Sequence, residues 1–295
     1  MKSGFVSLLG RPNAGKSTLI NQLVGTKVAI VSDKPQTTRT RILGVKTTSA
    51  GQVVYVDTPG IHKPEHRMNA RMVDAAVGTL RDVDVLVWVL DASEPLGAGV
   101  RYVGHLLGRA SQPVVLALNK IDRMSKPALL PVIDQLRRER EFADIVPISA
   151  LSGDGVDRLE ASILAQLPEG DPLYPDDYLT DQPERTYVAE VVREKLLHHL
   201  RDELPYTTAV LVEEFAEPDE KGLMRVACVI LVESGSQKGI VIGREGAMAK
   251  RIGTEARVEL EGFFGCRLFL ELHVKVRADW RDDERILDEL GLGRR

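Results

Sequence analysis

Residues 10–17 near the N-terminus have the spacing of a phosphate-binding loop. They read GRPNAGKS, which fits the pattern GxxxxGK[ST], and they follow an apolar run and open a helical pattern. Glycines let the backbone curl around an anion, so that successive N–H groups and the helix N-terminus point at it. Lys16 can neutralise β- and γ-phosphates. We therefore expect this segment to bind a nucleotide through Gly10, Arg11, Pro12, Asn13, Ala14, Gly15, Lys16, Ser17 and Thr18.

Hydroxyl groups at two places in the chain are predicted to hold Mg²⁺. The Ser17 hydroxyl is one ligand, and a threonine from a mobile loop is the usual second one. Here that loop reads KPQTTRTRI and contains Thr37 and Thr38. We favour Thr38, although either threonine alone could be an ordinary loop residue.

A DTPG sequence at residues 57–60 ends an apolar strand-like run. Asp57 can complete the Mg²⁺ shell, and the Gly60 amide can reach a γ-phosphate, with Thr58 and Pro59 between them. DTPG alone could be only a turn. Many GTPases place a glutamine directly after this motif to orient the attacking water. This chain has Ile61 there, so hydrolysis should be slow, or the water must be ordered by backbone groups, a partner or a cation.

The sequence NKID at residues 119–122 predicts which base is bound. The carboxylate of Asp122 can accept hydrogen bonds from both N1–H and the exocyclic amine of guanine, whereas adenine has no matching donor pair. Asn119 is expected to bridge the base and the phosphate loop, and Lys120 to lay its stem on the base. In a later SAL sequence, Ser149 and Ala150 are expected to offer a backbone N–H to the guanine carbonyl.

Short apolar runs alternate with helical patterns through this part of the chain. Strands are expected at 5–9, 52–57, 83–91 and 114–119, with helices from about residue 16 and over 68–79. This alternation predicts an α/β domain with a mostly parallel, doubly wound sheet and helices on both faces. Such sheets bind ligands in the loops where strands end, and the four motifs occupy those loops.

Composition predicts a globular chain of two domains. The 295 residues are 43% hydrophobic and 28% charged, and the net charge of −4 neither indicates nor excludes a nucleic-acid partner. The longest apolar run is far too short to span a bilayer, and the N-terminus leads directly into the phosphate loop, so we expect a cytoplasmic protein without a cleaved signal. Cysteine and histidine spacing predicts no structural metal, and Cys228 reads as a buried thiol.

The stretch 167–183 contains four prolines and several acidic residues without periodicity, which is typical of a linker. We therefore expect a nucleotide domain over 1–170, a linker over 171–183, a second domain over 184–280 and a tail over 281–295. In the second domain, patterns predict a helix at 187–202, strands at 207–215 and 224–233, two helices joined by a loop over 239–264, and a strand at 267–276.

A GxxG sequence joins the two adjacent helices of this second domain. In K-homology domains such a loop clamps about four nucleotides of single-stranded nucleic acid. Residues 237–257 carry five basic and two acidic side chains, a net +3 that favours a phosphate partner. A glycine turn between solvated helix faces is the competing interpretation. The expected RNA-binding residues are Gly243, Arg244, Glu245, Gly246, Lys250 and Arg251.

The motifs GRPNAGKST, PQTTR, DTPG, NKID and SAL resemble those of the Era family, within the TrmE-Era-EngA-like bacterial GTPases. The segments SGSQKGIVIGREGAMAKRIGTEAR and LELHVKVRADWRDDERILDELG resemble the C-terminal domain of that family, so the resemblance covers nearly the whole chain. It implies a P-loop GTPase domain followed by an α+β type II KH domain. It also implies GTP or GDP and Mg²⁺ as cofactors.

The resemblance further implies a function and partners. Members of this family hydrolyse GTP, bind 16S ribosomal RNA near its 3′ end, assist maturation of the 30S subunit and associate loosely with the inner membrane. We expect a monomer. Related families with an asparagine in the phosphate loop recruit K⁺, so Asn13 either holds a monovalent cation or is purely structural. The catalytic residues implied are Lys16, Thr38, Gly60 and Asn13.

Three other functions compete with a GTP-controlled switch acting on RNA. A GTPase that activates an RNA-modification enzyme would need a modification domain, and the GxxG loop argues against it. A small-molecule kinase is disfavoured because NKxD selects guanine and no substrate lid is recognisable. A binding module with a degenerate nucleotide site conflicts with the intact Lys16, Ser17 and Asp57.

Overall fold

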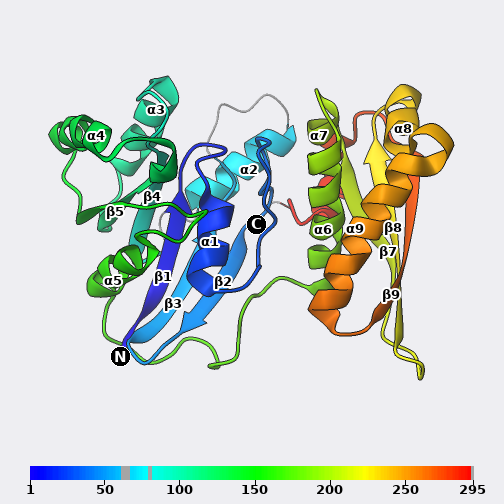
Figure 1. Ribbon diagram of the computed structural model, residues 1–295, viewed down its shortest axis with the longest axis horizontal. Helices are drawn as coiled ribbons and strands as arrows, with labels where there is room; N and C mark the ends of the chain where they lie inside the picture. The colour runs from blue at the N-terminus through cyan, green and yellow to red at the C-terminus, as the bar shows by residue number, and fades with distance from the viewer. Residues whose placement is uncertain (61–66, 79–81, 294–295) are drawn as a thin grey trace. The chain divides into compact units, whose positions relative to one another are not determined.

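The N-terminal part of the chain is built on a six-stranded sheet in the order β2-β3-β1-β4-β5-β6 (Figure 1). The structure, a computed structural model, describes residues 1–60, 67–78 and 82–293. Every strand pairing in this sheet is parallel except that of β2 with β3, so the predicted mostly parallel sheet is confirmed. The strands are β1 (Lys2–Leu9), β2 (Ile42–Thr47), β3 (Gly51–Asp57), β4 (Val85–Asp91), β5 (Val114–Asn119) and β6 (Asp144–Pro147).

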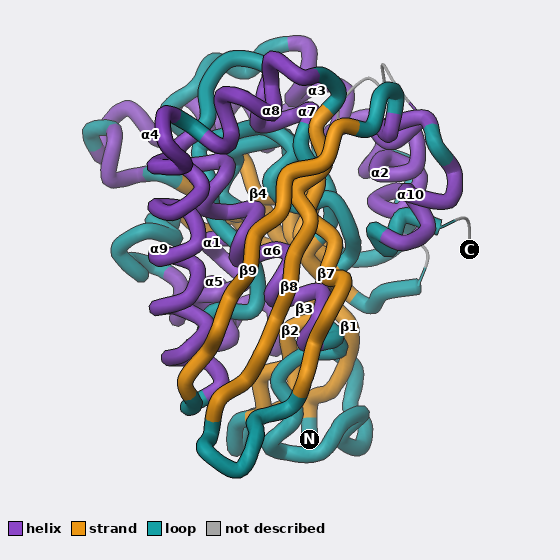
Figure 2. The backbone as a smooth tube through the Cα atoms, turned by 90° about the vertical axis from the view of Figure 1, so that its right-hand side faces the viewer, coloured by secondary structure: helices purple, strands orange, loops and turns teal. Residues whose placement is uncertain are grey.

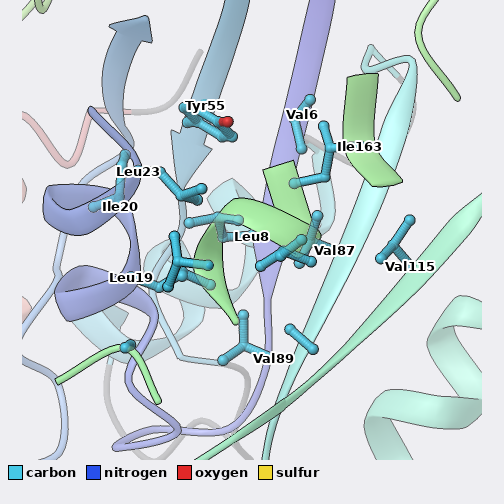
Figure 3. Close-up of a cluster of buried hydrophobic side chains, with 14 of the residues drawn as sticks. Val6, Leu8, Leu19, Ile20, Leu23, Tyr55, Val87, Val89, Val115 and Ile163 are labelled. Atoms are coloured by element: carbon cyan, nitrogen blue, oxygen red, sulfur yellow. The ribbon is translucent and has the colours of Figure 1, made fainter. Parts of the chain in front are cut away.

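Helices cover both faces of this sheet, as predicted. The core on one face is closed by α1 (Lys16–Val24) and α5 (Val156–Gln166). Figure 3 shows Leu19 and Leu23 of α1 and Ile163 of α5 packed toward strand residues of that core. The other face is closed by α2 (Arg67–Gly78), α3 (Ala98–Leu107) and α4 (Lys126–Glu139). Strands buried on both faces read as continuous apolar runs, which explains why β3, β4 and β5 could be recognised in the sequence. The predicted end of α2 at Thr79 lies outside the described residues.

The proline-rich stretch after α5, which was predicted as a linker, packs against the sheet. The buried amide of Gln52 accepts hydrogen bonds from the N–H groups of Leu173 and Tyr174 and donates one to the Tyr174 carbonyl. Farther along, the Leu179 carbonyl accepts a 2.8 Å hydrogen bond from the N–H of Val45. The main division of the described chain into two compact units falls between Asp181 and Gln182, and residues 67–71 at the start of α2 group with the second unit.

The second unit has a three-stranded sheet in the order β7-β8-β9, whose strands lie side by side in Figure 2. β7 and β8 are antiparallel, and β8 and β9 are parallel. The predicted order of helix, two strands, two helices and strand is confirmed. Its elements are α6 (Glu184–His199), α7 (Leu204–Thr207), β7 (Ala209–Ala216), β8 (Leu223–Val232), α8 (Gly235–Ile242), η3 (Arg244–Gly246), α9 (Ala247–Phe264), β9 (Arg267–Val276), η4 (Trp280–Asp282) and α10 (Glu284–Glu289).

One core holds the second unit together. Apolar residues of α6, α8 and α9 pack on one face of its sheet. Cys228 of β8 lies in this core, as predicted, and burial raises the pKa of its thiol to about 12 against the opposing charge of Arg185. The indole N–H of Trp280 donates to the Thr207 carbonyl at 2.9 Å, and this bond ties the C-terminal segment to the same unit. Across the described residues, no helix combines the length and apolar character needed to cross a membrane.

Candidate functional site

The phosphate-binding loop lies between the end of β1 and the start of α1, as its sequence predicts. Two of its glycines are required by close packing. A Cβ at Gly10 would overlap the carbonyl of Val89, and one at Gly15, where φ is +95°, would overlap the amide of Asn119. Only glycine adopts this conformation without strain. At these two positions the loop therefore has room for bare backbone and not for a side chain.

Lys16 extends under this loop and is buried. Its Nζ donates to the carbonyl of Arg11 at 3.1 Å and to that of Gly10 at 3.4 Å. Burial lowers the pKa of Lys16, and the nearby charge of Asp57 opposes that shift. Because its hydrogen-bond partners among the described residues are carbonyls, this buried ammonium gains strongly from an anion in the loop.

Two neighbouring cavities open beside the loop. The larger, of about 370 Å³, is lined by the phosphate loop, by residues 31–33 and 36–38 and by Gly60. The smaller, of about 120 Å³, lies between the NKID and SAL segments. Both are bordered by Gly15, Thr18 and Lys120. The larger cavity is lined by N–H groups and a lysine and therefore fits phosphates. The smaller cavity lies beside it, where a base attached to those phosphates would be.

Three oxygen-bearing side chains meet at the edge of the larger cavity. Ser17 Oγ and Thr38 Oγ1 lie 2.7 Å apart, and each donates to Asp57 Oδ2 at 2.9 Å. Asp57 Oδ1 is buried and has no hydrogen-bonding partner among the described residues. Burial raises the pKa of Asp57, while Lys16 and the two hydroxyls oppose the shift. Two hydroxyls and a buried carboxylate with an open oxygen form a donor set that fits Mg²⁺.

The two candidate threonines point to different partners. Thr38 is buried in the cluster with Ser17 and Asp57. Thr37 Oγ1 instead donates to the carbonyl of Lys34, within its own loop, at 2.6 Å. Of the two threonines, Thr38 is the one whose hydroxyl lies beside Ser17 and Asp57.

Asn119 joins the two loops that frame the smaller cavity. Its Nδ2 donates to the carbonyl of Ala14 at 2.8 Å, and its Oδ1 accepts from the N–H of Ala150 at 2.9 Å. Lys120 follows in the left-handed region with φ of 67°, and its Nζ lies 2.6 Å from Asp91 Oδ2. Partial burial alone would raise the pKa of Asp91, but hydrogen bonds from Lys120 and Ser93 lower it overall. The sequence motifs did not predict a role for Asp91. Its position at the end of a predicted strand could have indicated that it lies near the site.

The base-reading residues lie at the rim of the smaller cavity. Asp122 is exposed there, in the short helix η2 (Ile121–Arg123). The amides proposed to meet a guanine carbonyl are already donors: Ser149 N–H to the Asp154 carbonyl and Ala150 N–H to Asn119. A guanine carbonyl must compete with Asn119 for the Ala150 N–H or use the next amide, of Leu151, which has no partner in the described part of the chain.

Gly60 and Asn13 face the larger cavity from two loops. A Cβ at Gly60 would lie 2.8 Å from the backbone of Pro12, so glycine lets the two loops approach closely. Thr58, before it, is buried and donates to the carbonyl of Leu8. Asn13 is exposed, and its Nδ2 donates to the Asp33 carbonyl at 2.7 Å. Ile61, at the position where other GTPases hold water, lies outside the described residues.

The GxxG sequence forms an exposed loop between α8 and α9 of the second unit. Gly243 has φ of +74° and packs so closely that a Cβ would lie 2.7 Å from that of Met248. Gly246, with φ of +78°, has open space where a Cβ would stand. The side chains of Arg244 and Glu245 between them are 95% and 87% exposed. The backbone is therefore accessible to a ligand at the start of α9.

Basic residues on the first turns of α9 flank this loop. Lys250 and Arg251 are both exposed, and Arg251 pairs with Glu255 at 3.1 Å. Surface pairs of this kind contribute little and exchange readily. The structure therefore brings all six residues of the predicted RNA-binding set to one end of the second unit.

Two family models match this chain, one in each unit. Residues 5–120 match the family model of the 50S ribosome-binding GTPase, and residues 203–281 match that of the KH domain. A protein named GTPase Era from Geobacter metallireducens is 48% identical over 290 residues, which cover 98% of this chain and 97% of the relative.

Two solved structures match the full chain. One is Era in complex with MgGDPNP and nucleotides 1506–1542 of 16S ribosomal RNA, with 40% identity, complete coverage of both chains and a TM-score of 0.97. The other is a variant of Aquifex aeolicus Era bound to GDP·AlF4−, with 39% identity, complete coverage of both chains and a TM-score of 0.95.

Proposed function

The chain belongs to the Era family of GTPases, and on this premise we propose that it is a GTP-controlled switch that binds 16S ribosomal RNA near its 3′ end and assists maturation of the 30S subunit. The observation that carries the RNA half of the proposal is the open GxxG backbone at Gly246, beside exposed basic residues. The family relationship makes the N-terminal unit a P-loop GTPase domain that uses guanine nucleotide and Mg²⁺, and makes the second unit a KH domain.

In the nucleotide site, Ser17, Thr38 and Asp57 would hold Mg²⁺. The ion, when bound, neutralises charge that develops on the phosphate oxygens. Lys16 lies under the loop and supplies a second positive charge there. Gly60 brings its segment against Pro12, where its N–H can be held near the terminal phosphate. Without a glutamine at position 61, intrinsic turnover should be slow.

The two threonines give a matched test of the Mg²⁺ site. Thr38→Ala should raise the Mg²⁺ concentration needed for half-maximal GTP hydrolysis by about tenfold or more, because one hydroxyl of the donor set is lost. Thr37→Ala should leave it nearly unchanged, because the Thr37 hydroxyl donates to the Lys34 carbonyl, whereas the Thr38 hydroxyl donates to Asp57. Titration of Mg²⁺ against initial rate measures both. Equal shifts in the two variants would contradict the assignment of Thr38.

We further propose that Asn13 holds a monovalent cation during hydrolysis. Its side-chain N–H donates to Asp33, and no N–H or O–H in the described chain donates to its Oδ1, which leaves that oxygen for a cation. Replacing K⁺ by Na⁺ should slow GTP hydrolysis severalfold in the native protein and have no effect in Asn13→Ala. If the native protein hydrolyses GTP at the same rate in K⁺ and in Na⁺, the proposed cation site is wrong.

The RNA-binding loop is tested by charge removal. Replacing Lys250 and Arg251 together by glutamine should weaken binding of a single-stranded RNA and reduce the slope of log affinity against log salt by about 1.4, since each phosphate contact contributes about 0.7. The same two charges removed elsewhere in the unit, by Lys221→Gln with Arg285→Gln, provide the control. A slope that falls equally in both double variants would place the RNA elsewhere.

The remaining assignments depend on the family relationship. We propose that the chain acts in the cytoplasm as a monomer and that a peripheral contact with the inner membrane uses the basic face of α9, because anionic lipids and RNA attract the same charges. Flotation with vesicles containing one-third anionic lipid should recover the native protein and not the variant that lacks Lys250 and Arg251.

A further inference from the structure

A further cavity lies in the nucleotide domain outside the phosphate and base cavities. It has a volume of about 390 Å³ and lies between α3 and α4, over the strand residue Trp88. Its lining includes none of the phosphate loop, NKID or SAL residues. The established chemistry of the domain therefore leaves this cavity unused.

Its rim is basic. Arg101, His105 and Arg109 come from α3 and the turn that follows it, and Arg140 stands at the end of α4. Glu139 is the acid on the rim, and it accepts a hydrogen bond from Gln135. Three guanidinium groups against one carboxylate leave an excess positive charge over a concave surface, which attracts a phosphate.

Arg140 carries an unsatisfied donor. Its Nη1 is buried and has no hydrogen-bonding partner among the described residues. Burial also lowers the pKa of its guanidinium. A buried guanidinium N–H without an acceptor costs free energy, so a rotation of the Arg140 side chain that brings this N–H to an anion in the cavity would be favoured.

The floor is apolar and aromatic. Trp88 and Phe142 lie with ring centroids 6.1 Å apart, and Leu136 is beside them. Gly104 of α3 faces the indole, and even a Cβ there would approach it to 3.3 Å. The absence of a side chain at Gly104 therefore lets α3 approach the indole closely. An apolar floor under a basic rim is the combination that binds a base and its phosphate together.

We propose that the cavity between α3 and α4 binds a nucleotide unit, with its phosphate at Arg140 and the neighbouring arginines and its ring on the floor formed by Trp88 and Phe142. The nucleotide is either free or part of an RNA strand, because the recognised chemistry is the same. Since adenine does not match Asp122 in the GTP site, adenosine monophosphate is a suitable probe of this second site.

The test uses the full chain loaded with GDP and Mg²⁺, so that the GTP site is filled. Adenosine monophosphate or tetra-adenylate is titrated while tryptophan fluorescence is recorded, because Trp88 borders the cavity. We expect a saturable change with at least one probe, weakened tenfold or more in Arg140→Gln. Arg137→Gln, which removes an exposed charge from the same helix outside the cavity lining, should behave like the native protein.

The two probes separate the two sources. Saturation by adenosine monophosphate supports a free nucleotide, and saturation by tetra-adenylate alone supports an RNA strand. No change with either probe, or an equal change in Arg140→Gln, overturns the proposal. GDP affinity of Arg140→Gln, expected to be native, shows that the domain is folded and keeps this outcome separate from any failure of the GTP site.

Discussion

Replacing Asp122 by asparagine should lower the affinity for GTP by at least about 100-fold, since sites built to hydrogen-bond a substrate discriminate by 10⁴ or more. The carboxylate of Asp122 accepts from two donors on guanine, and an asparagine amide presents one acceptor and one donor in their place. Xanthine has a carbonyl where guanine has its exocyclic amine. The Asp122→Asn variant should therefore gain affinity for xanthosine triphosphate as it loses affinity for GTP. Competition binding with both nucleotides measures the exchange.

Asp134→Asn makes the same chemical change on the exposed face of α4 and should leave both affinities unchanged. If Asp122→Asn bound GTP like the native protein, the base would be read by another residue. A loss of affinity for both nucleotides, with native circular dichroism, would equally contradict the switch of base preference.

Replacing Lys16 by alanine should reduce GTP turnover by about 10²- to 10³-fold, the usual effect of removing one preorganised electrostatic group. The ammonium is buried and held by the carbonyls of Gly10 and Arg11, so it stands in place before phosphate arrives. Single-turnover hydrolysis at saturating GTP isolates this effect from binding. Lys46→Ala removes a lysine from β2, where it pairs with Glu160, and should leave turnover unchanged. Native turnover in Lys16→Ala would mean that the loop is not the reactive site.

The parts of the fold with strong sequence signals could be predicted. β3, β4 and β5 are buried along almost their whole length and read as apolar runs, and the motifs at their ends mark the site. β2 was missed because it is a short antiparallel edge strand, and its pairing partner β3 comes later in the chain. The sequence predicts a linker over 171–183 and not its packing on the sheet, because a hydrogen bond such as that between Val45 and Leu179 leaves no trace in local composition.

At the site, too, contacts between segments that are distant in the sequence could not be predicted from local patterns. Asp91 and Lys120 end adjacent parallel strands, so their pairing follows from strand order and not from any motif. Similarly, Arg101 and Arg140 reach one cavity only because α3 and α4 pack on the same face of the sheet. Each of these residues has an ordinary sequence context.

In the proposed switch, the guanine nucleotide bound to the first domain controls RNA binding by the second. The most direct test compares the affinity of the full chain for an RNA with the sequence of the 16S 3′ end in the presence of a non-hydrolysable GTP analogue and in the presence of GDP. We predict at least tenfold tighter binding with the analogue, and loss of that binding when Lys250 and Arg251 are replaced by glutamine. Equal affinity in the two nucleotide states, or no affinity in either, would contradict the claim.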